Sequence, residues 1–484
     1  MAEVEFAPRK QRFFCTAGRG LERFVVDEVT QKASALDVEA MSGKVFFTTE
    51  PDLSRLRKIK SGERLFLLLY KGPNLRLPRN KGSALSLLRK SLIGDHQVWI
   101  KTLDLWQNLQ EQAQQQQKCL EKDHIKAAKR KLESSPLLHM SKLCKRGHDA
   151  GDKISELEEQ RHDKCLNQPE HRHFGDTEEK NITEQSLTST KSTITFRVSC
   201  RCTGANARLF TGEEVGRFIG ISLMKLFGWK TDLRSPVLEV FVHLNDLYTV
   251  VGFPIFRQPL ASREYIRSTG LRTTTAWAMA TLAEIRDGSV VLDPMCGVGT
   301  ILLEAAKEWP NTHYVGMDID TTQLKNAVDN VKSAGVGLSI EFLKGSVLGL
   351  PILSESIDVV ISDLPFGKKF TSPRNMKELL PEILREMERV VRVGGIIVLL
   401  LSQSLHHHMK IHFQFKDVKR ESTARTENDL LHKDKKEMAL NKKDIVMKED
   451  CFESLVPIES HSVSLGVTEA VIFKCKKASN ATTF

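Results

Sequence analysis

The chain has 484 residues, of which 40% are hydrophobic and 27% are charged, a balance that allows buried cores and argues against global disorder. Its apolar runs, such as 65–70 and 396–401, are far shorter than the roughly 18 residues of a membrane span, so we expect a soluble protein. The N-terminus does not resemble a secretory signal. Nine scattered cysteines without a CxxC pair favour reduced intracellular thiols over disulfides or a structural zinc site.

The net charge of +10 is concentrated in the front part of the chain. Residues 1–106 hold 19 Lys and Arg against 12 Asp and Glu, whereas residues 285–415 hold 13 against 15. Residues 71–90 contain six bases and no acid. This distribution indicates a polyanion-binding module joined to a second domain, although a solvated basic surface explains it equally well.

The front part alternates strands and helices as a small α+β unit does. We expect it to end near residue 106. Residues 107–192 follow with a glutamine tract, many charges and a single aromatic residue, Phe174, and this composition predicts a mostly disordered insert. The triplet 129–131 is a candidate nuclear address. The predicted elements of the front part are strands at 12–16, 43–47 and 64–71 and a helix at 21–31.

A second module is predicted over residues 193–260. Its elements are strands at 195–202, 238–244 and 248–253 and a helix at 212–227. Cys200 and Cys202 share one face of the first strand, where packing into the core is favoured over metal binding. A connecting segment is expected at 261–284.

From residue 285 to 475 buried strands alternate with helices, which predicts a doubly wound, mostly parallel sheet. Residues 416–454 interrupt this pattern with a second charged insert, and the last strand is expected to be antiparallel. The predicted strands are 290–293, 314–318, 340–344, 358–363, 396–401 and 468–475, and the predicted helices are 299–307, 323–334 and 376–392.

A glycine-rich turn follows the first of these strands. Gly297 and Gly299 allow a ligand to approach the backbone closely, but Leu302 stands where a dinucleotide fingerprint has its third glycine. Asp293, just before the turn, would repel a pyrophosphate and suits a cofactor with a positive centre, such as S-adenosylmethionine. Asp318 ends the next strand, where an acid holds ribose hydroxyls. A tight strand–helix turn without a ligand is the alternative.

The sequence Asp363-Leu364-Pro365-Phe366 stands at the carboxyl end of the fourth strand. Enzymes that methylate planar nitrogens carry this pattern, because the Asp363 carboxylate and the Leu364 carbonyl can accept both N–H groups and direct the lone pair to the methyl group. Pro365 fixes the turn, and Phe366 can stack on a flipped base. A turn followed by a core phenylalanine is the alternative. The triplet 406–408 is expected to be a solvated loop rather than a metal site.

Together these motifs resemble the THUMP-domain RNA guanosine-N2 methyltransferases. The resemblance rests on 14–18, on 196–232 with Asn206 and 213–216, on 271–274, and on the motifs just described. It implies three parts: a ferredoxin-like unit, a THUMP module that binds structured RNA, and a Rossmann-type methyltransferase domain that uses S-adenosylmethionine. The structured RNA would be a tRNA or a small nuclear RNA. The cofactor residues that it implies are Thr274, Asp293, Cys296, Gly297, Gly299, Thr300, Asp318, Ser346 and Asp363.

The same resemblance implies a small zinc-binding activator subunit as a heterodimeric partner. We expect the strands 396–401 and 468–475 to lie near an exposed sheet edge that this subunit covers. The nucleus is favoured over the cytoplasm as the site of action. The basic residues expected to contact RNA phosphates are Lys71, Arg76, Arg79, Lys81, Arg257, Arg263, Arg267 and Arg272.

The chain departs from the family at two positions. Thr273 stands where many members have proline, and Ser346 follows the third strand where many have an acid for the adenine amine, so weaker cofactor binding by the chain alone is expected. An RNA-binding or assembly protein with an inactive methyltransferase domain is the alternative function, and the intact motif at Asp363 argues against it. A protein-amide methyltransferase would more typically carry Asn at Asp363.

Overall fold

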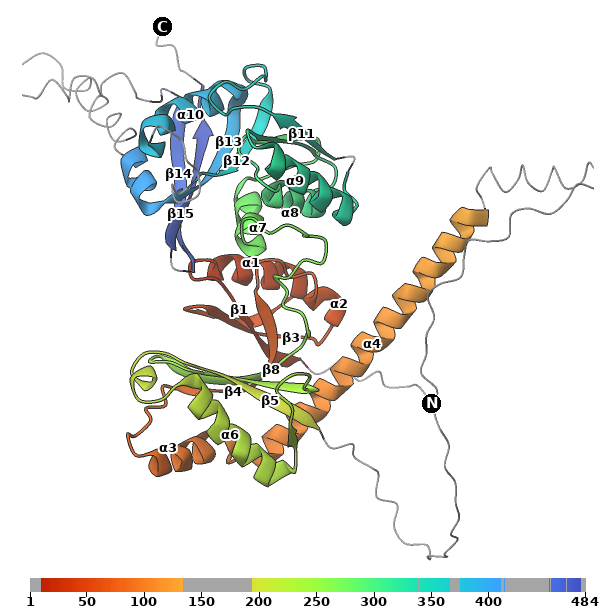
Figure 1. The fold of residues 1–484 in the computed structure, drawn as a ribbon, viewed down its shortest axis with the longest axis vertical. Coiled ribbons are helices and arrows are strands. Elements are labelled where there is room, and N and C mark those ends of the chain that lie inside the picture. Colours follow the sequence, from red (N-terminus) through yellow and green to blue (C-terminus); the bar gives the residue numbers. More distant parts are fainter. Residues whose placement is uncertain are drawn as a thin grey trace, which may run out of the picture.

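The structure is a computed structural model that describes residues 10–133, 194–337, 339–365, 375–410, 413, 452, 454–466 and 468–479. Its strands form two sheets, one in the middle and lower parts of Figure 1 and one in the upper part. The predicted α/β class is confirmed. Every helix in the described ranges is too short or too polar to cross a lipid bilayer.

The N-terminal sheet joins two segments that the sequence separates. Its eight strands run in the order β2-β3-β1-β4-β8-β7-β5-β6, and β4 pairs antiparallel with β8. The predicted front unit and the predicted THUMP core therefore share one continuous sheet. The front elements are β1 (Gln11–Thr16), α1 (Glu22–Ala33), β2 (Leu36–Met41), β3 (Lys44–Thr49), α2 (Leu53–Leu56), β4 (Arg64–Pro73) and α3 (Lys81–Leu88).

The THUMP part of the sheet is covered by the amphipathic helix α6 (Gly212–Phe227). Thr211 and Glu214 form a reciprocal capping box at its start, and Gly228 ends it in the left-handed conformation. Cys200 and Cys202 pack against the core beside this helix, as expected. The strands here are β5 (Thr195–Cys202), β6 (Lys230–Thr231), β7 (Leu238–Leu244) and β8 (Tyr248–Pro254).

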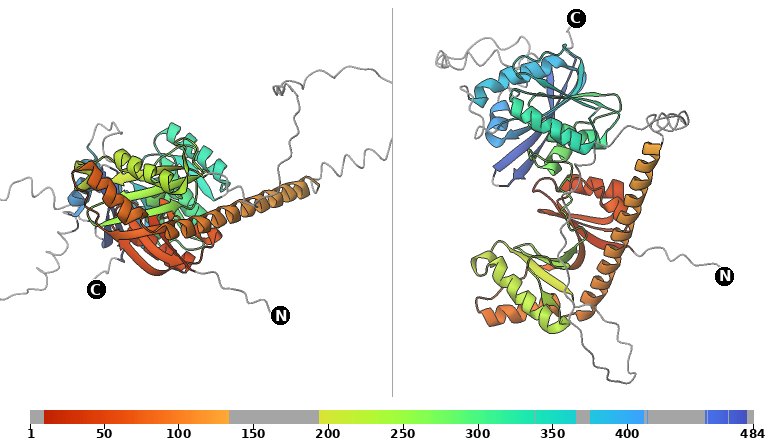
Figure 2. Two further views of the ribbon diagram at one scale, coloured as in Figure 1. Left: turned by 90° about the horizontal axis from the view of Figure 1, so that it is seen from below. Right: turned by 45° about the vertical axis from the view of Figure 1, so that its right-hand side comes forward.

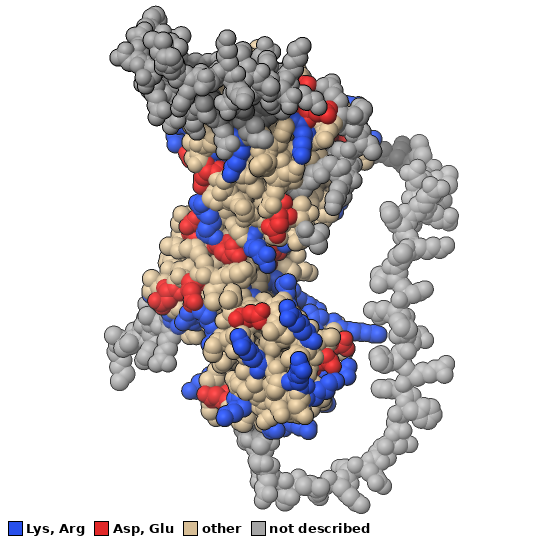
Figure 3. Space-filling view, turned by 90° about the vertical axis from the view of Figure 1, so that its left-hand side faces the viewer, with Lys and Arg blue, Asp and Glu red and all other residues tan. Residues whose placement is uncertain are grey.

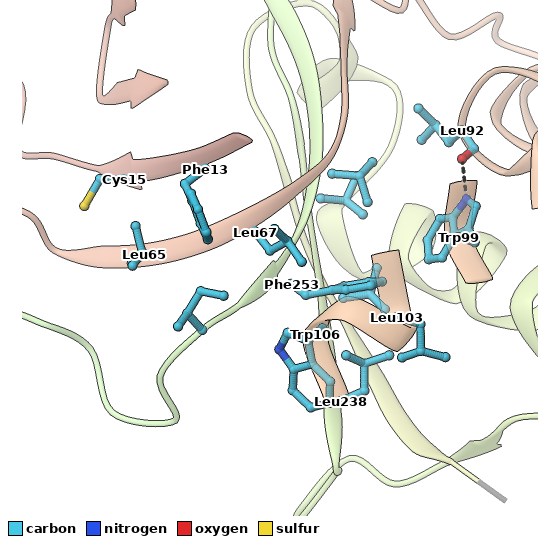
Figure 4. Close-up of a cluster of buried hydrophobic side chains, with 14 of the residues drawn as sticks. Phe13, Cys15, Leu65, Leu67, Leu92, Trp99, Leu103, Trp106, Leu238 and Phe253 are labelled. Carbon is cyan, nitrogen blue, oxygen red and sulfur yellow. Dashed lines mark hydrogen bonds between the residues drawn. The ribbon is translucent and has the colours of Figure 1, made fainter. Parts of the chain in front are cut away.

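Helix α4 (His96–Glu133) crosses the boundary predicted at residue 106. Its apolar side chains Trp99, Leu103 and Trp106 lie beside Phe253 of β8 (Figure 4). Leu109 is buried as well, so the ordered unit extends past the predicted start of the insert. Each large apolar side chain buried here contributes roughly 1.5–3 kcal/mol. Figure 2 shows α4 running along the side of the N-terminal sheet and projecting beyond it. The rest of the predicted insert, 134–192, lies outside the described residues.

The C-terminal sheet has the order β11-β10-β9-β12-β13-β15-β14. The strands β9 to β13 are parallel, while β15 runs antiparallel to β13, as predicted, and to β14. Its elements are α7 (Thr273–Leu282), β9 (Val290–Asp293), α8 (Thr300–Glu308), β10 (His313–Asp318), α9 (Thr321–Ala334), β11 (Ile340–Lys344), β12 (Ile357–Asp363), α10 (Met376–Val390), β13 (Val391–Ser402), β14 (Leu455–Leu465) and β15 (Thr468–Lys477).

The expected positions of the last strands in this sheet are wrong. β13 and β15 are interior strands, and the edges are β14 on one side and β11 on the other. The error arose because strand β14 was not predicted. Residues 406–408, expected in a loop, lie on a helix at 403–410, where the ring of His406 contacts Phe473. The charged insert predicted at 416–454 lies almost entirely outside the described residues.

The N-terminal unit packs on the C-terminal domain through α1. Leu21 and Phe24 belong to the same hydrophobic cluster as Val463 of β14. Ser464 N–H donates to the Arg19 carbonyl at 2.9 Å, and Lys32 pairs with Glu308 of α8 at 2.7 Å. These contacts hold the C-terminal domain against the front half of the N-terminal sheet.

Candidate active site

The sheet order of the C-terminal domain reverses between β9 and β12. The chain runs outward from β9 through β10 to β11, then returns to form β12 on the other side of β9. Ligands of doubly wound sheets bind at the carboxyl ends of the strands at such a point. Asp293 ends β9 and Asp363 ends β12, so both acids stand at the expected position.

The glycine-rich turn after β9 has the conformation that glycine alone adopts without strain. Gly297 and Gly299 have φ values of 53° and 77°. Cys296 N–H donates to the Met317 carbonyl at 2.8 Å, which ties the turn to the end of β10. Gly299 is the N-cap of α8, and the first N–H groups of this helix have no partner within the helix. Burial and the charges of Asp293 and Asp318 raise the pKa of the Cys296 thiol, so it stays protonated.

Asp318 shapes this turn as well as facing the site. Its Oδ2 accepts from Gly297 N–H at 2.9 Å, and its Oδ1 accepts from Asp320 N–H at 2.8 Å. Each carboxylate oxygen keeps a further lone pair, which suits hydroxyl donors of a ribose. Gly345 N–H donates to the backbone carbonyl of Asp318 at 3.2 Å, which brings Ser346 beside the same strand end.

Asp293 is fully buried, and Ser362 of β12 donates to its Oδ1 at 2.9 Å. Burial raises the pKa of Asp293 to about 8, and the charges of Asp363 and Asp318 add to this effect while the bond from Ser362 opposes it. Three acidic side chains thus meet at the switch point, and Asp293 is mostly protonated at neutral pH without a ligand. A positively charged ligand would stabilise their ionised forms.

Asp363 is half-buried at the end of β12, and burial raises its pKa to about 7. The next residue, Leu364, donates its N–H to the Leu400 carbonyl of β13 at 3.1 Å and buries its side chain. This fixes the backbone at the turn that Pro365 continues. Phe366 lies outside the described residues, so its predicted stacking role stays a prediction.

Two threonines of the predicted cofactor site differ in their contacts. The buried Thr274 hydroxyl donates to Glu63 Oε1 at 3.2 Å and is therefore engaged by the N-terminal unit. The buried Thr300 hydroxyl makes no hydrogen bond within the described part of the chain. It stands on the first residue of α8, where helix N–H groups favour an anion. Ser346 uses its hydroxyl to accept from Leu348 N–H at 3.3 Å.

These residues fit S-adenosylmethionine. The orphaned Thr300 hydroxyl and the α8 N-terminus would take its carboxylate, the buried acids would face its positive groups, and Asp318 would hold its ribose. The side chain of Ile319, which the sequence did not indicate, is exposed beside Asp318 and would offer an apolar surface to the adenine ring.

The basic residues predicted to contact RNA fall into three groups. Arg263 is wrongly placed among them, because its guanidinium is buried in a pair with Glu304 and also donates to the Leu260 and Lys60 carbonyls. Lys71, Lys81 and Arg272 lie at the surface but pair with the acids Glu39, Glu214 and Glu63. The exposed members outside these pairs are Arg76, Arg79, Arg257 and Arg267.

Figure 3 shows Lys and Arg side chains gathered over the lower part of the molecule, which the N-terminal sheet forms. The distribution agrees with the surplus of bases counted in residues 1–106. A surface of this sign attracts phosphates, so the predicted role of these bases in RNA binding stays a prediction.

Further side chains contact the candidate site from positions far away in the sequence. Ser362 bonds to Asp293, and Glu63 accepts from both Thr274 and Arg272. Asn330 of α9 donates to the Val298 carbonyl in the glycine-rich turn at 3.0 Å. Sequence position alone gives no signal for these contacts.

The fold and the acid-lined switch point define a Rossmann-type methyltransferase. A family model described as RMKL-like, methyltransferase domain, matches residues 261–434. The solved structure of TrmN from Thermus thermophilus superposes with a TM-score of 0.58 at 18% identity, covering 97% of this chain and 100% of that one, and supports the same fold.

The U6 snRNA (guanine-N(2))-methyltransferase THUMPD2 of Bos taurus is 44% identical to this chain, and the Homo sapiens protein of the same name is 43% identical. Each alignment covers 96% of this chain and 96% of the relative. The tRNA (guanine(6)-N(2))-methyltransferase THUMP3 of Bos taurus is 26% identical, with 80% of each chain covered. The chain belongs to the THUMP-domain RNA guanine-N2 methyltransferase family and is an S-adenosylmethionine-dependent enzyme.

Proposed function

We propose that this enzyme methylates the exocyclic N2 amine of a guanosine in a small nuclear RNA of the U6 type, and that it acts in the nucleus. Relatives named for U6 snRNA align over nearly the whole chain at 43–44% identity, whereas a relative named for tRNA aligns at 26%. The observation that carries the chemistry is the position of Asp363 at the switch point, on the strand next to Asp293.

In this proposal the end of β12 orients the amine. The lone pair of a guanine amine is delocalised into the ring, so the nitrogen is a weak nucleophile. The Asp363 carboxylate and the Leu364 carbonyl accept its two N–H groups and turn the lone pair toward the donor. When bound, S-adenosylmethionine would supply an electrophilic methyl group, and breaking its S–CH3 bond would leave the donor as a neutral thioether. The amine nitrogen becomes cationic as the new bond forms, and Asp363, whose pKa burial raises to about 7, accepts its surplus proton.

The test compares two RNA substrates under the same conditions. The chain, co-expressed with the partner proposed below, is incubated with a labelled methyl donor and either a U6-type RNA or a tRNA, and N2-methylguanosine is measured. We expect label in the U6-type RNA and none with Asp363→Ala. Label in tRNA alone would overturn the substrate assignment. RNA binding without transfer to any guanosine would favour the alternative of an assembly protein.

The proposal includes a small zinc-binding activator subunit that pairs with the β11 edge of the sheet. Of the two edges, β14 already contacts the N-terminal unit through Ser464 and His461. β11 presents Leu343, which is 42% exposed, at the other edge. An uncovered edge strand with an apolar side chain favours pairing with another chain.

Co-purification tests this partner. Leu343→Asp on β11 is expected to abolish recovery of the subunit with the chain and to reduce solubility. Leu353→Asp is the control, because Leu353 is 80% exposed and lies outside the strand. Full turnover by the purified single chain would contradict the requirement for a partner. Equal loss in both variants would contradict pairing at β11.

A further inference from the structure

Asn330 uses its whole side-chain amide in hydrogen bonds. It lies on α9, is 1% exposed, and donates from Nδ2 to the Val298 and Ser268 carbonyls, each at 3.0 Å. Its Oδ1 accepts from Arg267 N–H at 2.8 Å and from Ser268 N–H at 3.0 Å. Two donors and two acceptors are all that an amide offers, so this side chain has a single, fully determined orientation.

The groups that Asn330 joins belong to different parts of the enzyme. Val298 is the residue between Gly297 and Gly299 in the glycine-rich turn. Arg267 and Ser268 belong to the segment that leads from the N-terminal sheet into the catalytic domain, and the Arg267 side chain is exposed. One buried amide therefore sets the distance between the turn and this segment.

Packing next to Asn330 supports the same link independently. A Cβ built on Gly270 would lie 2.6 Å from Val298 Cγ2 and 3.0 Å from Thr300 Oγ1, closer than side-chain atoms pack. The segment therefore lies directly on the turn with no spare room. The buried pair between Arg263 and Glu304 fixes the same segment to α8 further along, at 3.1 Å.

We propose that Asn330 is a positioning residue, which holds the turn 297–300 in the conformation that binds S-adenosylmethionine and fixes the Arg267 backbone beside it. Removing its donors takes a hydrogen bond from the buried Val298 carbonyl and from the partly buried Ser268 carbonyl, and other conformations of the turn then become accessible. Cofactor binding must select the competent conformation and loses affinity. The inference rests on the proposed assignment of 297–300 as the cofactor turn.

The test uses the full chain with its partner and two variants that break the link differently. Asn330→Asp keeps acceptors for the Arg267 and Ser268 N–H groups and removes both donors. Gly270→Ala keeps Asn330 and pushes the segment off the turn. Asp329→Asn is the matched control, because Asp329 is exposed on the same helix. Calorimetric affinity for S-adenosylmethionine, KM and kcat for methyl transfer, and the thermal midpoint are measured for each.

We expect Asn330→Asp and Gly270→Ala to raise the KM for the cofactor and weaken its binding by about tenfold, the factor of one ordinary hydrogen bond, with kcat at saturating cofactor retained. A residue needed only for folding would lower the thermal midpoint and kcat and leave KM unchanged. That result in both variants would overturn the inference. If Asn330→Asp does not fold, Gly270→Ala tests whether the contact between the segment and the turn supports cofactor binding, and unchanged affinity in it would overturn the inference.

Asp318→Ala separates the two levels of the argument. Loss of cofactor affinity in Asp318→Ala with unchanged affinity in the Asn330 and Gly270 variants would reject the positioning role and keep the cofactor turn. Unchanged affinity in Asp318→Ala would reject the assignment of the turn itself.

Discussion

The Ser362 hydroxyl donates to Asp293 Oδ1 at 2.9 Å and joins the ends of β12 and β9 at the point where the sheet order reverses. Ser362 directly precedes Asp363, so one hydrogen bond links the proposed methyl-acceptor residue to the first acid of the proposed cofactor site. For transfer, the methyl carbon and the amine nitrogen must lie about 3–3.5 Å apart and in line, and a hydrogen bond between neighbouring strands favours such a fixed geometry.

Replacing Arg263 is expected to destabilise the protein strongly. Arg263→Ala leaves the Glu304 carboxylate buried, with the Tyr265 hydroxyl as a remaining donor at 2.8 Å. Breaking a buried ion pair in this way costs about 3–5 kcal/mol in the free energy of unfolding. Arg272→Ala is the control and is expected to cost at most about 1 kcal/mol, because its pair with Glu63 is half-exposed. Urea titration measures the free energy of unfolding of both variants. Equal losses of unfolding free energy in the two variants would contradict a stabilising role of the buried pair.

Lys44 gives the unfolding free energy a specific pH dependence. It is 4% exposed beside His243 at 2.6 Å and Tyr248 at 3.2 Å, and burial together with the charge of Arg201 lowers its pKa from 10.5 to about 7. The unfolded chain therefore binds a proton between pH 7 and 10.5 that the folded chain releases. Stability should rise with pH across this window.

Lys44→Met removes that titration. We expect the variant to be more stable than the wild type at pH 7, and the difference in unfolding free energy to shrink between pH 7 and 9. Lys81→Met, at an exposed position, is the control. A difference that stays constant with pH would show that the Lys44 pKa is not lowered.

RNA affinity should fall steeply with salt. The log–log slope is expected to change by about 0.7 to 0.9 for each phosphate neutralised. Arg76→Ala and Arg79→Ala should each reduce the slope by about one, because both side chains are exposed and lie in the acid-free stretch 71–90. Fluorescence anisotropy over a salt series measures this. A flat response in the wild type would remove phosphate contacts as the basis of binding.

Most strands were predictable because hydrophobic patterning along the strand and turn residues at its ends mark them in the sequence. Strands β5, β7, β9 and β11 and helix α6 have the bounds predicted from hydrophobic patterning and turn residues. β2 and β14 were missed because both are edge strands with polar, half-exposed sequences, and β14 contains Pro457 near its start. Helix α7 was missed because it is buried on every side and so lacks an amphipathic pattern.

Some parts of the candidate site were predictable from the sequence and others were not. The turn at Gly297 and the motif at Asp363 are local in sequence, so residue order was enough to place them. Asn330, Glu63 and the true position of Arg263 depend on contacts between residues tens to hundreds of positions apart. The pattern of charges in a sequence does not distinguish an arginine that is buried in a pair with a distant glutamate from an arginine that is exposed to solvent.

Asp318→Ala is expected to weaken cofactor binding for two reasons. It removes the acceptor of the Gly297 N–H bond that shapes the turn, and it removes the acceptor proposed for the ribose. Hydrogen bonds to a charged group contribute roughly 1.5–3 kcal/mol each. Calorimetry with S-adenosylmethionine, performed on the chain co-expressed with its proposed partner, measures the loss of affinity. The exposed Asp329→Ala is the control, and an affinity equal to wild type in Asp318→Ala would reject this site.

The decisive prediction concerns Asp363. Asp363→Asn keeps the size of the side chain but replaces one acceptor with a donor that faces the amine, and it removes the charge that stabilises the cation forming on nitrogen. Losing one such preorganised contact typically costs on the order of 10²–10³ in turnover. Asp363→Ala should be at least as damaging, while RNA affinity should hardly change because phosphate contacts dominate it.

The pH dependence of methyl transfer identifies the group. Burial raises the pKa of Asp363 to about 7, and the side chain accepts hydrogen bonds from the amine only when ionised, so kcat/KM should fall as pH drops below 7. Bound cofactor carries positive charge and favours the ionised carboxyl, so the profile of kcat should shift to lower pH. Asp293, with a pKa raised to about 8 by burial, adds a second step that Asp363→Asn retains. The measurement is single-turnover methyl transfer with saturating RNA over a pH series. A rate of Asp363→Asn near that of the wild type, with an unchanged pH profile, would mean that the carboxylate is structural. The proposed mechanism would then be wrong.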